Sequence, residues 1–300
     1  MAVKSLVAAI DLDEPSAAAV RWASAVFAPN ADVTLLHVIE PPNRPWFARH
    51  LLPEAEQIEA VAREHAATRL REIASSIDRA NVRFEIRLGS PYEQICAYAQ
   101  QAGADLVVIG PHGDRPRPSK FLGTTAERIV RMSAAPVLIV MSPPDGPAKR
   151  LLVPVDDADV TPRVLDWTRR IAEQFDADVA LLHVWSNAVY SYVASMSFAT
   201  EKNEAAAREE IRRELSEAAT HWLQEMSRTG LRRDRVTAEV TYGDAGARTL
   251  EVAAEKRADM IVMGRSGAGI ARAAFLGSTV GTVLHGARRP ILIVTDGAKP

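Results

Sequence analysis

Short apolar runs alternate with longer stretches of helical pattern along the first half of the chain. Each run has the length of a β-strand and few polar positions, which is typical of a parallel strand buried on both faces. The pattern predicts strands over Ser5 to Ile10, Val33 to Ile39, Val82 to Leu88, Leu106 to Ile109 and Val137 to Val140, and helices near Ser16 to Phe27, Pro53 to Arg79, Tyr92 to Gln101 and Thr124 to Met132.

The second half of the chain repeats this order of elements. Its longest predicted helix, from about Thr200 to Arg228, carries opposite charges three and four residues apart, so we expect a solvated face with ion pairs and assign it no function. Continuous apolar strands joined by helices favour a parallel sheet covered on both faces, and hence an α/β fold. The strands predicted here are Leu151 to Val155, Val179 to Val184, Val236 to Val240, Met260 to Met263 and Ile291 to Val294.

The two halves are copies of one domain. Matching residues lie 154 positions apart in four pairs, and a period of about 150 residues equals one ordinary domain. Residues 142–147, Ser-Pro-Pro-Asp-Gly-Pro, suit a linker, so we predict domain 1 over residues 1–142 and domain 2 over residues 148–300. The four pairs are Gly89 and Gly243, Asp105 and Asp259, Gly110 and Gly264, and Pro136 and Pro290.

Composition narrows the class of protein. The chain has 300 residues, 47% of them hydrophobic, which is enough for two cores, and its net charge of −2 gives no electrostatic argument for binding nucleic acid. The single cysteine, Cys96, cannot form a disulfide within the chain, and we expect it to be a small core residue. The N-terminal apolar run is too short for an export signal, and no stretch resembles a membrane span, so we expect a soluble cytoplasmic protein.

The most informative motif is a glycine spacing that occurs once in each half. Two residues separate the first two glycines, and nine separate the second glycine from a Gly-hydroxyl pair. Each loop leads from an apolar strand into a predicted helix, where backbone N–H groups and a helix N-terminus can hold an anion. The motif residues are Gly110, Gly113 and Gly123-Thr124 in the first half, and Gly264, Gly267 and Gly277-Ser278 in the second.

An aspartate follows the first strand of each half. In open parallel sheets, ligands bind beyond the carboxyl ends of the strands, at the point where the strand order reverses. If the order is 3-2-1-4-5, Asp11 meets Gly110 at that point, and Asp156 meets Gly264 in the second half. A simpler alternative is that Asp11 and Asp156 only cap the turn that follows them.

These motifs together resemble the universal stress protein family, in its tandem form and its ATP-binding subgroup. The resemblance implies two tandem doubly wound five-stranded parallel-sheet domains of the adenine nucleotide alpha-hydrolase-like class, with strand order 3-2-1-4-5. Besides the glycine loops and the aspartates, it rests on segments 35–38 and 181–184, 104–113 and 258–267, and 135–140 and 289–294.

The resemblance also implies one ATP site in each half, with Mg²⁺ as an optional companion ion. Asp11 and Asp156 would bind the ribose or adenine side, and Val38 and Val184 would present backbone groups to the adenine ring. The glycine loops would hold the sugar and the phosphates. The implied site residues are Ala9, Asp11, Val38, Ile109, Gly110, His112, Gly113, Gly123, Thr124 and Thr125 in the first half, and Pro154, Asp156, Val184, Met263, Gly264, Ser266, Gly267, Gly277, Ser278 and Thr279 in the second.

Two other histidines, His37 and His183, occupy matching positions in the second strands. We expect them to be buried and hydrogen-bonded rather than to bind a ligand, and no cluster of Cys and His supports a metal site.

The resulting hypothesis is an ATP-binding stress-response protein that senses or sequesters nucleotide and passes its ligand state to an unidentified protein partner. Fast catalysis is not expected, because phosphoryl transfer needs a placed base and usually a metal-binding carboxylate, and Asp114 is the only acid in either loop. Two alternatives stay open: an adenine-nucleotide-using enzyme with slow ATP hydrolysis, and an interaction module that needs no ligand.

The resemblance further implies that the fifth strands of the two domains pair antiparallel and make the chain a pseudo-dimer, with a homodimer as a further option. These strands are apolar and terminal in each half, so each needs a cover.

Overall fold

The computed structural model describes residues 3–41, 55–78, 81–110, 124–156, 158–185, 231–265 and 277–295, and five single positions between 213 and 224. It divides the chain into two compact units, Met1–Gly146 and Pro147–Asp296. The helix predicted from Thr200 to Arg228 lies outside the described residues except for those five positions. The pairing of the fifth strands between the two halves stays a prediction.

Unit 1 alternates strands and helices, as the sequence pattern predicts. All pairings between its strands are parallel, in the order β3-β2-β1-β4-β5. The order 3-2-1-4-5 and the α/β class are thus confirmed. The elements are β1 (Ser5–Ala9), α1 (Glu14–Phe27), β2 (Asp32–Ile39), α2 (Ala55–Ser75), β3 (Val82–Leu88), α3 (Pro91–Gln101), β4 (Leu106–Ile109), α4 (Thr124–Met132) and β5 (Val137–Ile139).

Unit 2 repeats this topology. Its strand order, β8-β7-β6-β9-β10, is again 3-2-1-4-5 when the strands are counted within the unit, and its pairings are parallel. Its described elements are β6 (Arg150–Pro154), α5 (Thr161–Phe175), β7 (Asp178–Trp185), a 3₁₀ turn η3 (Arg233–Arg235), β8 (Val236–Tyr242), α8 (Ala245–Glu255), β9 (Met260–Gly264), α9 (Ser278–Gly286) and β10 (Ile291–Val294).

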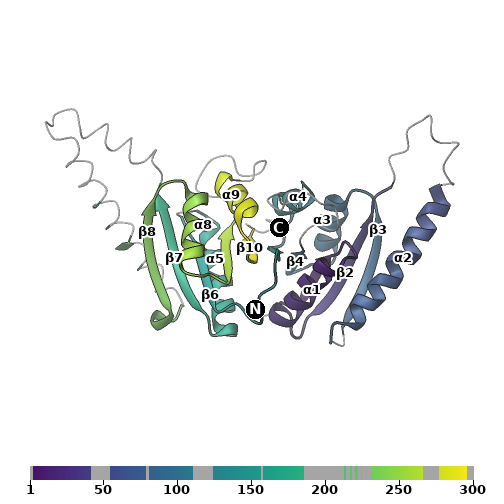
Figure 1. Cartoon of the computed structure of the whole chain (residues 1–300), viewed down its shortest axis with the longest axis horizontal. Helices are drawn as coiled ribbons and strands as arrows, with labels where there is room; N and C mark the ends of the chain where they lie inside the picture. The colour runs from purple at the N-terminus through teal and green to yellow at the C-terminus, as the bar shows by residue number, and fades with distance from the viewer. Residues whose placement is uncertain are drawn as a thin grey trace, which may run out of the picture. The chain divides into compact units, whose positions relative to one another are not determined.

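The first strand of each unit lies at the centre of its sheet. Leu6, Val7 and Ala8 of β1 are fully buried, as are Leu152 and Val153 of β6, which explains why these runs lack an alternating polar pattern. Parallel crossovers are right-handed, and the connections after β3 run back across the sheet, so α1 and α2 cover one face and α3 and α4 the other. Figure 1 shows α2 running along β3.

The predicted ends of the elements hold to within a few residues. The helix predicted to reach Arg79 ends at Ser75. The N–H of Ser76 bonds to the carbonyl of Ile73, and that of Ile77 bonds to Ala74, so tighter three-residue turns close this helix.

Cys96 lies in α3 and is half-buried. Burial raises the pKa of its thiol to about 11. The thiol is therefore protonated at neutral pH and lacks the nucleophilic thiolate that a reactive cysteine needs.

An aspartate fastens the start of the central strand in both units. Oδ2 of Asp105, just before β4, accepts hydrogen bonds from the backbone N–H groups of residues 4 and 5 at 2.8 and 3.1 Å. Oδ2 of Asp259, just before β9, accepts from residues 149 and 150 at 3.1 and 3.0 Å. Each carboxylate thus ties the first strand to the fourth at the amino edge of the sheet and sets the register with which both strands reach the opposite edge.

The Asp259 bonds predict a pH-dependent stability. Burial of this carboxyl opposes its ionisation, but hydrogen bonds from the Arg150 side chain and the Lys149 N–H outweigh it and hold the pKa of Asp259 below its ordinary 3.8. Because the folded-state pKa is the lower one, ionised Asp259 stabilises the fold above the unfolded-state pKa, and this contribution is lost as the pH falls toward the folded-state pKa. We expect Asp259→Asn to cost about 1–2 kcal/mol at about pH 7 and less at about pH 3.

Urea unfolding of the wild-type chain and of Asp259→Asn at both pH values checks this prediction. Asp145→Asn, which changes an exposed carboxylate in the predicted linker, is the matched control and should have little effect at either pH. A difference between wild type and Asp259→Asn that grows as the pH falls would contradict the assignment.

Candidate functional site

The carboxyl ends of the first and fourth strands form the edge at which the predicted site residues gather. In unit 1, Ala9 at the end of β1 pairs with Ile109 at the end of β4, and Gly110 follows directly. Asp11 lies two residues beyond β1 and is exposed. The strand order places the reversal point between β1 and β4, so these residues share one edge.

Unit 2 builds the matching edge. Pro154 ends β6, Asp156 follows it, and Met263 and Gly264 end β9, which pairs with β6. The hydroxyl residues predicted for the phosphates lie at the starts of the following helices: Thr124 and Thr125 begin α4, and Ser278 and Thr279 begin α9. Five predicted site residues lie outside the described residues: His112, Gly113, Gly123, Ser266 and Gly267.

Two contacts to residues of β2 and the cap of α1 fix the loop after β1. The N–H of Ile10 bonds to the Leu36 carbonyl at 3.0 Å, and the imidazole Nδ1 of His37 lies 2.7 Å from the Ile10 carbonyl oxygen. Leu12 adopts a left-handed conformation with φ of 65°, which turns the chain away from the sheet. Asp13 then caps α1, its Oδ1 accepting from the Ser16 N–H at 2.8 Å.

The N-cap of α1 is therefore Asp13 and not Asp11. The simpler alternative, that Asp11 caps the turn that follows it, stays a prediction. In unit 2 the residue at the N-cap position of α5 is Val160, and the Asp156 carbonyl accepts a hydrogen bond from Oγ1 of Thr161 at 2.7 Å. Asp156 is likewise not the N-cap. Both aspartates lie on the loop, before the cap.

His183 repeats the role of His37. Its Nδ1 lies 3.0 Å from the carbonyl oxygen of Val155, the residue before Asp156. The expectation that both histidines are hydrogen-bonded is confirmed, but both are half-buried rather than buried. The sequence signal for this pairing is the shared Leu-Leu-His-Val ending of the second strands.

The backbone of Val38 faces the gap beyond the end of β1. Residues two apart in a strand form their backbone hydrogen bonds on the same side. The Leu36 carbonyl bonds toward β1, at Ile10, whereas the Ile39 carbonyl bonds toward β3, at the N–H of Gly89. Val38 therefore points its N–H and carbonyl to the β1 side, where the β1 chain has already turned away.

Val184 has the same geometry. The Leu182 carbonyl bonds to Val155 after β6, and the Trp185 carbonyl bonds to Gly243 after β8, so the backbone of Val184 points to the β6 side beyond its end. Its side chain packs against the cluster formed by Leu152, Leu182, Val252 and Ala258. The backbone of Val184, and not its side chain, is therefore available to a ligand at this edge.

Close packing explains why the first position of the loop in unit 1 is a glycine. A Cβ at Gly110 would lie 2.8 Å from Cα of Ser16 and 3.4 Å from Cβ of Ala19, because α1 crosses directly over the end of β4. This close approach is part of the fold itself, so Gly110 is required with or without a ligand.

Packing does not require a glycine at position 277. Its φ of −56° is open to any residue, and the nearest atom to a Cβ there would be the Arg265 carbonyl oxygen at 4.0 Å. This contact also shows that the two ends of the glycine loop, after β9 and before α9, lie side by side. α9 begins at Gly277 without a side-chain cap, whereas α8 is capped by Asp244.

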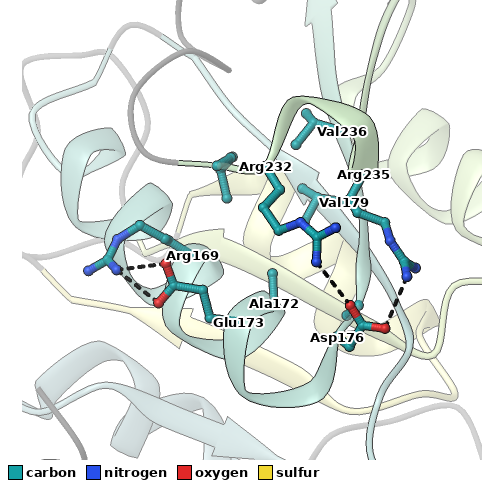
Figure 2. Close-up of a pocket in the computed structure, with 10 residues that line it drawn as sticks. Arg169, Ala172, Glu173, Asp176, Val179, Arg232, Arg235 and Val236 are labelled. Atoms are coloured by element: carbon teal, nitrogen blue, oxygen red, sulfur yellow. Dashed lines mark hydrogen bonds and ion pairs between the residues drawn. The ribbon is translucent and has the colours of Figure 1, made fainter.

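Unit 2 also contains a shallow pocket at the opposite, amino edge of its sheet, between the end of α5 and the start of β8 (Figure 2). Its volume of about 20 Å³ suits a single water molecule and not a nucleotide. Ion pairs occupy its rim: Arg169 with Glu173, and Arg232 and Arg235 with Asp176. We infer that these ion pairs attach η3 to the end of α5, and that the pocket does not bind a ligand.

Two doubly wound parallel sheets, each with an acidic loop and a helix start at the reversal point, define the class of the protein. The model of the Universal stress protein family matches residues 2–141 and again 147–295. The chain therefore belongs to this family, in tandem form. Among the described residues, no helix is long and apolar enough to cross a membrane.

The relatives include tandem proteins of similar length. One universal stress protein of Mycobacterium tuberculosis is 24% identical over 306 residues, which cover 97% of this chain and 96% of that protein. The crystal structure of a universal stress protein from Archaeoglobus fulgidus superposes with a TM-score of 0.67 at 20% identity, covering 98% of this chain and 97% of the other. A universal stress protein solved in complex with cAMP is 24% identical, with a TM-score of 0.35, and covers 47% of this chain and 98% of its own.

The surroundings of Gly110 and Gly277 predict unequal losses of stability on substitution by alanine. Gly110→Ala should destabilise the ligand-free chain by about 1–3 kcal/mol, because its Cβ meets the α1 backbone. Gly277→Ala should cost less than about 1 kcal/mol, because the space is open and only the preference for glycine at an N-cap is lost.

Chemical unfolding of the two ligand-free variants checks the difference. Gly281→Ala, inside α9 with nothing within 4 Å of the new Cβ, is a control that should stabilise by about 0.5–1 kcal/mol. Equal losses for Gly110→Ala and Gly277→Ala would show that the packing of α1 on β4 does not explain Gly110.

Proposed function

We propose that domain 1 (1–142) and domain 2 (148–300) of this chain each bind an adenine nucleotide, and that the protein is an ATP-binding stress-response protein. It senses or sequesters nucleotide and passes its ligand state to a protein partner. ATP is the proposed ligand, and Mg²⁺ enters as its counter-ion. Catalysis is at most slow hydrolysis.

The observation that carries this proposal is the backbone of Val38 and Val184. Each presents an N–H and a carbonyl to the gap beyond the end of the central strand, as the hydrogen bonds of the neighbouring residues require. A donor and an acceptor side by side on a rigid strand match the paired acceptor and donor on the edge of an adenine ring.

The neighbouring groups suit the rest of a nucleotide. Asp11 and Asp156 offer carboxylate oxygens as acceptors for ribose hydroxyls. At the other end of the edge, α9 starts at Gly277 without a side-chain cap, so its first N–H groups can donate to phosphate oxygens, with the helix dipole favouring the negative charge. Ser278 and Thr279 add hydroxyl donors in the same turn.

The proposal predicts two sites for each chain. Calorimetric titration of nucleotide-free protein with ATP should give a stoichiometry near two, and AMP and cAMP titrated in parallel define which nucleotide is preferred. A stoichiometry near one would contradict the equivalence of the halves. No binding of any of the three would contradict the proposed function and favour an interaction module that needs no ligand.

Substitutions of the two aspartates test whether each half holds its own site. Asp11→Asn and Asp156→Asn should each weaken binding in their own half, because the amide loses the charge and one acceptor for the ribose. Asp32→Asn is the matched control: this exposed aspartate begins β2 at the opposite edge of the sheet and should leave both sites unchanged. Equal effects of the three substitutions would contradict the placement of the sites.

A further inference from the structure

The same imidazole contact occurs in both units, next to the residue that carries the proposed ribose acceptor. We propose that His37 and His183 are positioning residues: each takes over a ladder hydrogen bond at the end of the central strand, and so frees a backbone donor for the nucleotide and fixes the aspartate beside it. This inference rests on the proposed function and names the residues that set the affinity of each site for nucleotide.

The first step is the register of the strands. Ala9 pairs with Leu36, so Ile10 stands opposite His37, and the Ile10 N–H bonds to the Leu36 carbonyl. If the parallel ladder continued, the Ile10 carbonyl would accept from the N–H of Val38. Instead, it accepts from the His37 imidazole at 2.7 Å.

In unit 2 an imidazole likewise takes the place of a ladder hydrogen bond. Pro154 pairs with Leu182, so Val155 stands opposite His183, and its N–H bonds to the Leu182 carbonyl at 2.9 Å. The Val155 carbonyl accepts from the His183 imidazole at 3.0 Å, where the continued ladder would use Val184.

The second step is the proton. A carbonyl oxygen only accepts, so Nδ1 of each histidine must carry the hydrogen. This requirement excludes the tautomer in which only Nε2 carries the hydrogen.

The third step is the consequence for the site. The imidazole holds the Ile10 carbonyl, and the left-handed Leu12 then turns the chain, so Asp11 lies between two fixed points. The Val38 N–H faces the same gap and is released from the ladder. One side chain thus couples the carboxylate that accepts from the ribose to the backbone group that reads the base.

Three substitutions at His37 test the proposal by ATP titration in the Asp156→Asn background, where the first half is the tighter of the two sites. His37→Leu removes the donor and should weaken binding about tenfold, the loss expected for one hydrogen bond. His37→Asn places an amide N–H at the same distance from Cβ as Nδ1 and should stay within about twofold of the parent. His37→Gln moves the amide one bond further and should bind as weakly as His37→Leu.

Two controls separate positioning from folding. His65→Leu changes an exposed histidine in α2 and should leave affinity unchanged. His37→Gln keeps a polar side chain of similar size, so it serves where His37→Leu does not fold. A merely structural role would lower the thermal midpoint of the variants without separating Asn from Gln in ATP affinity.

The ¹⁵N resonances of the imidazoles give an independent readout, since they distinguish protonated from unprotonated Nδ1. The proposal predicts a protonated Nδ1 in both His37 and His183 of the ligand-free chain. An unprotonated Nδ1, or unchanged affinity in His37→Gln while the parent binds ATP, would overturn the inference and leave the proposed function standing. No ATP binding by the wild-type chain would overturn both.

Discussion

Parallel pairing of the central strand with both of its neighbours is the constraint on which each unit depends. β1 and β6 are flanked on both sides by parallel strands, so all carboxyl ends in a unit reach one edge. Asp105 and Asp259 fasten the central strand at the amino edge, about 100 residues away along the chain. A shift of one residue there would exchange the faces of the strand and dismantle the opposite edge.

The duplicated halves reach the same edge by partly different local means. Unit 1 caps α1 with the Asp13 side chain, whereas Val160 occupies the N-cap position of α5 and the Thr161 hydroxyl donates to the Asp156 carbonyl. The contact between imidazole and carbonyl is common to both. Features that persist while their surroundings differ are the best candidates for shared function, which is why the histidines carry more weight than the caps.

Much of the fold could be predicted from the sequence, because buried parallel strands leave long apolar runs and a duplication of about 150 residues shows in any residue comparison. The site could be predicted only in outline. Asp11 and Asp13 are equally good caps by residue type, and only the path of the loop selects Asp13. Gly110 and Gly277 look alike in the motif, yet one is required by the backbone of α1 and the other is not. These distinctions depend on contacts between distant segments that no local pattern contains.

The central claim is that both carboxyl edges bind nucleotide through backbone groups that the strands present. Backbone amide NMR during an ATP titration tests it most directly. The account predicts that the largest shifts occur at Val38 and Val184, next to the loops that carry Asp11 and Asp156, and at the start of α9. Shifts confined to the amino edge of unit 2, around Arg232 and Arg235, or no shifts at either carboxyl edge, would contradict it.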